Sequence, residues 1–83
     1  MQDHPSALNV AQVLPWVTPW HYQFLLMVLQ AKFYLPATPV ESDTALLLTS
    51  PLYGLLEFLW WSRKYRLTPL GVAVVAALTH ARR

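Results

Sequence analysis

Residues 44–61 read TALLLTSPLYGLLEFLWW, and the basic residues Arg63, Lys64 and Arg66 follow at once. The run comes close to the roughly 20 apolar residues that a transmembrane helix needs. Aromatic side chains and positive charge at one end are typical of a helix that ends at a membrane–water interface. This stretch therefore favours a membrane protein.

The composition of the chain points the same way. Of its 83 residues, 55% are apolar and 12% are charged, about half of the usual charged share of roughly 25%. A chain this short buries little of its surface in water, so we expect lipid or a partner to cover apolar patches. The absence of cysteine excludes disulfides and thiolate metal sites.

We predict an all-α fold: a small membrane protein made of a two-helix transmembrane hairpin and a short C-terminal interfacial helix. Thr18-Pro19 is a good helix start, and Pro51 inside the second helix indicates a kink. The single domain, residues 1–83, divides into an irregular segment 1–18, a first helix 19–35, a second helix 44–65 and a last helix 69–82. Within the irregular segment, Ser6 to Leu14 is a candidate short helix capped by Ser6.

Polar residues inside the apolar segments are candidates for helix packing. Ser50, Gly54 and Glu57 share one helix face, and a pair of small residues lets another helix approach closely. Gln23 and Gln30 line one face of the first helix in the same way. The alternative for the Ser50–Gly54 pair is chance spacing, and the alternative for Gln23 and Gln30 is a face turned to a groove or to lipid headgroups.

Glu57 is the strongest single candidate for a specific role, because a carboxylate inside a bilayer usually faces protein or water. In the predicted hairpin it lies level with His21 and Gln23, so we expect a hydrogen bond to one of them. The alternatives are a proton relay, a ligand to a pigment or ion, and a hydrated carboxylate near the interface. His21 is also a candidate axial ligand to haem or chlorophyll.

The aromatic and basic cluster at the end of the second helix is predicted to be an interfacial anchor. Its residues are Trp60, Trp61, Arg63, Lys64 and Arg66. A headgroup or quinone site is the alternative interpretation. Neither a catalytic motif nor a metal-binding spacing is present, so we predict no enzyme, no metal and no cofactor beyond bound lipid.

Three stretches resemble the ciliary transition-zone tetraspan family, and the resemblance covers residues 24–79. They are Phe33-Tyr34-Leu35-Pro36, then Asp43 with Leu46-Leu47-Leu48, then Gly54-Leu55-Leu56-Glu57. The family carries a Gly-Asn-Leu element where this chain reads Tyr65-Arg66-Leu67, and its members are longer, with four spans. The resemblance implies a membrane-organising role.

We expect the chain to be a non-catalytic accessory or structural subunit of a larger membrane-embedded complex, because a two-helix hairpin cannot cover its own polar face. Such subunits are common in respiratory and photosynthetic assemblies, which indicates the mitochondrial inner membrane, with the thylakoid or ciliary membrane as alternatives. The expected partners are other membrane subunits and anionic lipids; nucleic acid and small-molecule substrates are not expected. The alternatives are the ciliary role, a pigment- or quinone-binding subunit, and a soluble helical protein whose apolar stripe is hidden in a complex.

Overall fold

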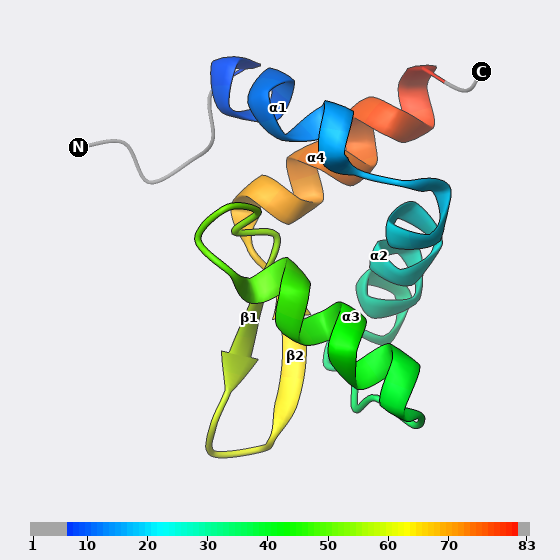
Figure 1. Cartoon of the computed structure of the whole chain (residues 1–83), viewed down its shortest axis with the longest axis vertical. Helices are drawn as coiled ribbons and strands as arrows, with labels where there is room; N and C mark the ends of the chain where they lie inside the picture. The colour runs from blue at the N-terminus through cyan, green and yellow to red at the C-terminus, as the bar shows by residue number, and fades with distance from the viewer. Residues whose placement is uncertain (1–6, 82–83) are drawn as a thin grey trace.

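The structure is a computed structural model that describes residues 7–81, and its elements are short (Figure 1). In chain order they are α1 (Ala7–Val13), the 3-10 helix η1 (Leu14–Trp16), α2 (Pro19–Ala31), α3 (Pro39–Thr49), β1 (Leu56–Leu59), β2 (Lys64–Leu67) and α4 (Pro69–Ala81). Figure 1 shows α1 and α4 together at one end of the molecule, while β1 and β2 project at the other end. The two strands form an antiparallel sheet, so the predicted all-α class is wrong.

Three helices begin where a threonine precedes a proline. The proline occupies the first helical position, where its missing N–H is not needed. The threonine hydroxyl accepts a hydrogen bond from the third helical amide, which has no partner within the helix. The pairs are Thr18 with His21, Thr38 with Glu41, and Thr68 with Gly71, at 3.1, 3.2 and 3.0 Å.

The predicted second helix, 44–65, is wrong over most of its length. α3 ends at Thr49, because Ser50 adopts an extended conformation with ψ 155°, as is favoured directly before Pro51. Gly54 then has φ +61°, which glycine adopts without steric penalty. These two residues turn the chain, and the residues after Gly54 enter the hairpin.

The predicted transmembrane hairpin is wrong as well. α2 and α4 contain 13 residues each, which gives a length of about 20 Å at a rise of ~1.5 Å per residue. In residues 7–81, no helix is both long enough and apolar enough to span a bilayer. The integral-membrane location, whether mitochondrial inner, thylakoid or ciliary, is therefore wrong, since it depended on spanning helices.

The two ends of the chain also differ from the prediction in part. α1 and η1 occupy 7–16 of the segment predicted to be irregular, and α1 falls within the candidate short helix Ser6 to Leu14. α4 is not an interfacial helix, because Gly71, Val74 and Val75 are buried and the helix contacts α1 and α2. Residues 1–6, and Arg82 at the end of the predicted last helix, lie outside the described residues.

The hairpin is joined to the helices through Tyr34. β1 pairs with β2 in the register Leu56↔Leu67 to Leu59↔Lys64, and the Ser62 and Arg63 amides close the turn on the Leu59 carbonyl. On the other side of β2, Tyr34 and Tyr65 exchange two backbone hydrogen bonds of 2.8 Å each. β2 is therefore held between β1 and the chain that leaves α2.

The core lies between the helices and the root of the hairpin. Its fully buried side chains come from α2, α3, α4 and the link before β1; they are Phe24, Leu25, Val28, Leu48, Leu55 and Val74. Gly71 lets α4 approach this link, because a methyl group there would overlap the carbonyl oxygen of Leu55. The same carbonyl accepts a 3.0 Å bond from the Thr68 amide, so α4 and the link are in direct backbone contact.

Candidate functional site

The predicted helix-packing residues lie in three separate places. Gln23 and Gln30 are exposed on α2. Ser50 is the C-cap of α3, and its amide donates to the Leu47 carbonyl. The Gly54 carbonyl accepts a 2.6 Å bond from the Thr68 hydroxyl. These residues do not share a helix with Glu57, so the predicted common face does not form.

Glu57 lies on β1 and pairs with the residue opposite it on β2. Its carboxylate accepts a 3.0 Å bond from the Arg66 guanidinium, and both side chains are more than two-fifths exposed. The predicted bond to His21 or Gln23 is replaced by this ion pair. An exposed pair of this kind contributes little to stability, about 0–1 kcal/mol.

His21 has a structural role at the start of α2. Its Nδ1 accepts a 3.3 Å bond from the Thr18 amide, which completes a capping box with the Thr18 hydroxyl. The imidazole is buried and lies edge-on to Tyr53, with ring centroids 5.7 Å apart. Since Nδ1 accepts this hydrogen bond, it carries no proton in this arrangement.

The hairpin brings together all five residues predicted to form an interfacial anchor. Trp60 and Trp61 are 75% and 65% exposed and meet edge-to-face, with ring centroids 5.8 Å apart. Arg63 and Lys64 follow them at the turn and are exposed. We use the name aromatic hairpin for β1, β2 and this turn. Large exposed aromatic side chains beside cations are typical of binding surfaces.

A line of hollows runs from the aromatic hairpin along α2 and α4. The hollow at the hairpin has a volume of about 270 Å³, and its lining includes Phe33, Trp61 and Arg66. The next, of about 180 Å³, shares Phe33 and Arg66 with it. The third, of about 500 Å³ between α2 and α4, shares Leu29 and Val72 with the second. We call this line of hollows the lateral groove.

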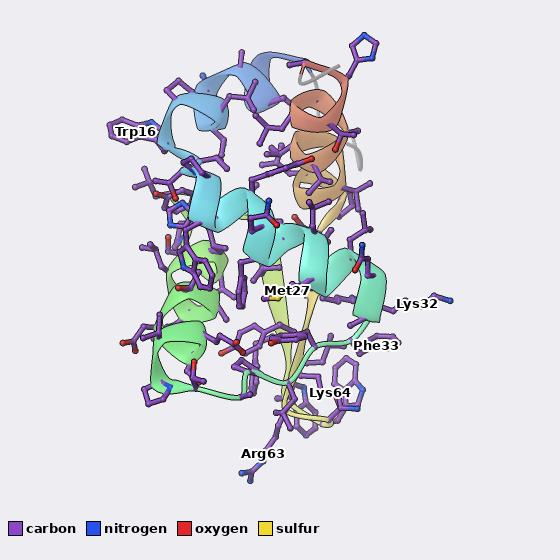
Figure 2. All side chains as sticks on the ribbon, turned by 90° about the vertical axis from the view of Figure 1, so that its right-hand side faces the viewer. Trp16, Met27, Lys32, Phe33, Arg63 and Lys64 are labelled. Atoms are coloured by element: carbon purple, nitrogen blue, oxygen red, sulfur yellow. The ribbon has the colours of Figure 1, made fainter. Side chains whose placement is uncertain are left out.

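The lateral groove is mainly apolar along its helical part, where Thr79 and His80 are the polar lining residues, and basic at its hairpin end. Among the described residues, its lining contains Lys32, Lys64 and Arg66 but neither Asp nor Glu. Figure 2 shows Lys64 and Phe33 on the same side of the molecule, with Lys32 extending outward from the end of α2. Arg63 points away from the body at the turn and is not part of the lining.

Sequence reasoning missed the helical part of the groove. Leu29, Phe33 and Val72 are 41%, 49% and 46% exposed, but they were assigned to apolar helices without a binding role. One signal was present: residues 70–78 contain no polar side chain. A helix that is apolar on every side is normally covered on every side.

Glu41 on α3 binds Tyr34, the residue that pairs with β2, and we call this contact the clamp. The Glu41 carboxylate accepts bonds from the Tyr34 hydroxyl at 2.6 Å and from the Ala37 amide at 2.9 Å. The Ala37 amide, followed by the Tyr34 hydroxyl, lowers the pKa of Glu41. The carboxylate in turn raises the pKa of Tyr34, chiefly through the hydrogen bond.

The arrangement of the exposed side chains is suited to binding the surface of another molecule. Within residues 7–81, no three metal-ligating side chains gather closely enough to hold an ion. The exposed groups instead combine large aromatic rings, aliphatic side chains and a few cations. Such groups recognise apolar and negatively charged partners.

Comparison of the chain with family models, curated proteins and solved structures finds no match. No relative therefore supports the predicted respiratory-chain and mitochondrial assignments. Those assignments are corrected together with the membrane location, because they depended on spanning helices that residues 7–81 do not form. The resemblance to the ciliary tetraspan family implied spanning helices, and none forms in the described part of the chain.

Proposed function

We propose that this chain is a non-catalytic accessory subunit that acts by binding another protein through the aromatic hairpin. The observation that carries the proposal is the exposure of Trp60 and Trp61 beside Arg63 and Lys64. Tryptophan and arginine are enriched among the residues that dominate binding energy in protein interfaces. The expected contact with anionic lipid stays a prediction for the same cluster.

The total exposed apolar surface supports a protein partner. Thirteen large apolar side chains are exposed in the described part of the chain; those outside the hairpin and groove include Trp16, Trp20, Leu46 and Leu52. Scattered exposed residues are normal, but a contiguous aromatic patch usually marks an interaction site. The hairpin has that contiguity, because Trp60 and Trp61 are in ring contact.

Affinity purification of the full chain from its native cells tests the proposal. We expect a partner in fixed stoichiometry with the wild-type chain, and its loss when both Trp60 and Trp61 are replaced by alanine. Leu46→Ala is the matched control, because Leu46 is 65% exposed on α3 and is not part of the aromatic hairpin. Partner recovery should be unchanged in this control.

Two outcomes would count against the proposal. One is that the wild-type chain is recovered alone at native concentration. The other is that the double tryptophan variant retains its partner at full stoichiometry while far-UV circular dichroism shows it to be folded.

A further inference from the structure

One face of α4 is apolar but exposed. α4 reads PLGVAVVAALTHA, in which Thr79 and His80 are the polar residues. Val72 is 46% exposed, and Ala76, one turn later on the same face, is exposed as well. Both residues line the lateral groove. This face has the composition of a helix face that is buried in a protein interior, so we expect a partner to cover it.

α2 provides the opposite wall of the groove with side chains of the same kind. Leu26 is partly buried and Leu29 is 41% exposed, and the two lie one turn apart. Together with Val72 and Val75 of α4 they form an aliphatic trough between two helices. A trough of this type accepts apolar side chains spaced along one face of a peptide segment.

Charge defines what can lie at the hairpin end of the trough. Lys32, Lys64 and Arg66 border this end. The Arg66 guanidinium bonds Glu57, which offsets one of the three positive charges. Lys32 and Lys64 remain to attract negative charge, and an opposite charge on the partner would favour association and fix its direction.

The described chain has no acidic surface that could complement this end in a second copy. Glu57 is paired with Arg66, and Glu41 bonds Tyr34 and Ala37. Asp43, on α3, is the remaining described acid. The phosphates of nucleic acid would pair with the lysines but would leave the aliphatic trough empty. An anionic lipid has acyl chains for the trough, and the vesicle experiment below distinguishes it from a protein segment. A protein segment uses both parts of the groove.

We propose that the lateral groove binds an acidic amphipathic segment of a partner protein. Its apolar side chains lie between α2 and α4, and its carboxylates lie beside Lys32 and Lys64. This inference rests on the proposed function, since it names the chemistry of the partner. The aromatic hairpin and the groove meet at Trp61, so one partner can contact both.

Selection from a random 16-residue peptide library displayed on phage, against the immobilised full chain, tests this inference. We expect enrichment of peptides that carry several Asp or Glu residues together with Leu, Ile, Phe or Trp at helical spacing. A parallel selection against the double variant Lys32→Glu with Lys64→Glu should enrich peptides with basic residues instead. Acidic peptides enriched equally on both proteins would overturn the assignment of the charged end.

Binding of one selected peptide to groove variants, measured by fluorescence anisotropy, locates the contact. We expect Val72→Glu and Lys64→Glu each to weaken binding by about tenfold or more, as for a dominant interface residue. Leu46→Glu is the matched control, because Leu46 is exposed but belongs neither to the groove lining nor to the aromatic hairpin. Its affinity should stay within about twofold. Leu29→Gln replaces Val72→Glu if circular dichroism shows that variant to be unfolded.

Three further probes distinguish other occupants: vesicles of phosphatidylcholine with phosphatidylserine, a 20-nucleotide oligo(dT), and the chain itself in sedimentation equilibrium. One outcome that overturns the inference has two parts. No acidic peptide is enriched, and the wild-type chain binds vesicles or oligo(dT), or self-associates, in a way that Val72→Glu abolishes. Absence of any enriched peptide above bead controls also overturns it. If a partner nevertheless co-purifies through Trp60 and Trp61, the proposed function survives and this inference alone fails.

Discussion

Phe24 and Leu25 have no exposed surface in the helical body, whereas Trp60 and Trp61 in the aromatic hairpin expose most of theirs. Both pairs belong to sequence stretches made mainly of aliphatic and aromatic residues. Burial of the first pair contributes to the stability of the fold, while exposure of the second pair leaves apolar area available for binding. The comparison teaches that apolar side chains stabilise the body but are available for a partner in the hairpin.

The largest expected effect is on the body side of this comparison. Phe24→Ala should lower the free energy of unfolding by about 4 kcal/mol, because the ring is fully buried and leaves a cavity. Urea denaturation followed by circular dichroism measures the loss. Trp60→Ala is the matched aromatic deletion in the hairpin, and its effect should stay below about 0.5 kcal/mol. Equal losses would remove the distinction between the two regions.

Gly71→Ala should have the next largest effect. The added methyl group overlaps the Leu55 carbonyl oxygen, which belongs to backbone and cannot rotate away. We expect a loss of about 3 kcal/mol, near the upper end of what overpacking causes, visible as a lower urea midpoint. Ala73→Gly, on the same helix, is a control for glycine propensity and should cost about 1 kcal/mol. A neutral Gly71→Ala would mean that α4 and the link are further apart.

Glu57→Gln tests the hairpin side with a smaller effect. Removal of the ion pair with Arg66 should lower the free energy of unfolding by less than about 1 kcal/mol, since both groups are well exposed. It should also free a positive charge at the end of the lateral groove and so strengthen acidic-peptide binding. Weaker peptide binding, measured by fluorescence anisotropy, would contradict the placement of the carboxylates.

The smallest effect concerns the clamp that joins the two regions. Because the pKa of Glu41 is lowered on folding, its carboxylate stabilises the fold above the unfolded pKa, and this contribution is lost as pH falls through the folded pKa. Because the pKa of Tyr34 is raised, the contribution of its neutral phenol is present below its unfolded pKa and is lost as pH rises through the folded one. The difference in unfolding free energy between the wild type and Glu41→Gln should therefore shrink below about pH 4. A difference that persists undiminished to pH 2 would contradict the clamp.

Two helix starts could be predicted from the sequence, because they depend on local signals, whereas α3 begins at Pro39 and not at the predicted residue 44. Thr18-Pro19 begins α2 and Thr68-Pro69 precedes α4, at the positions that the capping pattern indicates. A proline at the first position and a hydroxyl before it act within one turn of the chain. No distant contact is needed to read them.

The hairpin could not be predicted in the same way. Ser50-Pro51 resembles the three Thr-Pro starts, and proline is also tolerated inside membrane helices, so local signals alone did not decide. What decides is Gly54 in a left-handed conformation and the pairing of Tyr34 with Tyr65, which is remote in sequence. Strand preference depends on such packing more than helix preference does.

The part of the candidate site that depends on local sequence could be predicted, and the part that depends on remote contacts could not. The cluster from Trp60 to Arg66 is contiguous in sequence and stays together in the hairpin. The trough between Leu29 and Val72 exists only because α2 and α4 lie against each other, and no local pattern reports that contact. The sequence analysis also assumes that lipid covers the apolar helices. In the structure the helices cover much of one another, and the trough forms where they meet.

The two backbone hydrogen bonds between Tyr34 and Tyr65 have a consequence for the order in which the parts of the chain fold. It closes a loop that contains α3 and β1, and the entropy lost on closing a loop grows with its length. We therefore expect the hairpin to dock onto the helices late in folding and to detach early in unfolding. Faster amide hydrogen exchange at Tyr34 and Tyr65 than at Leu25 would reveal that detachment as a partial opening of the native protein.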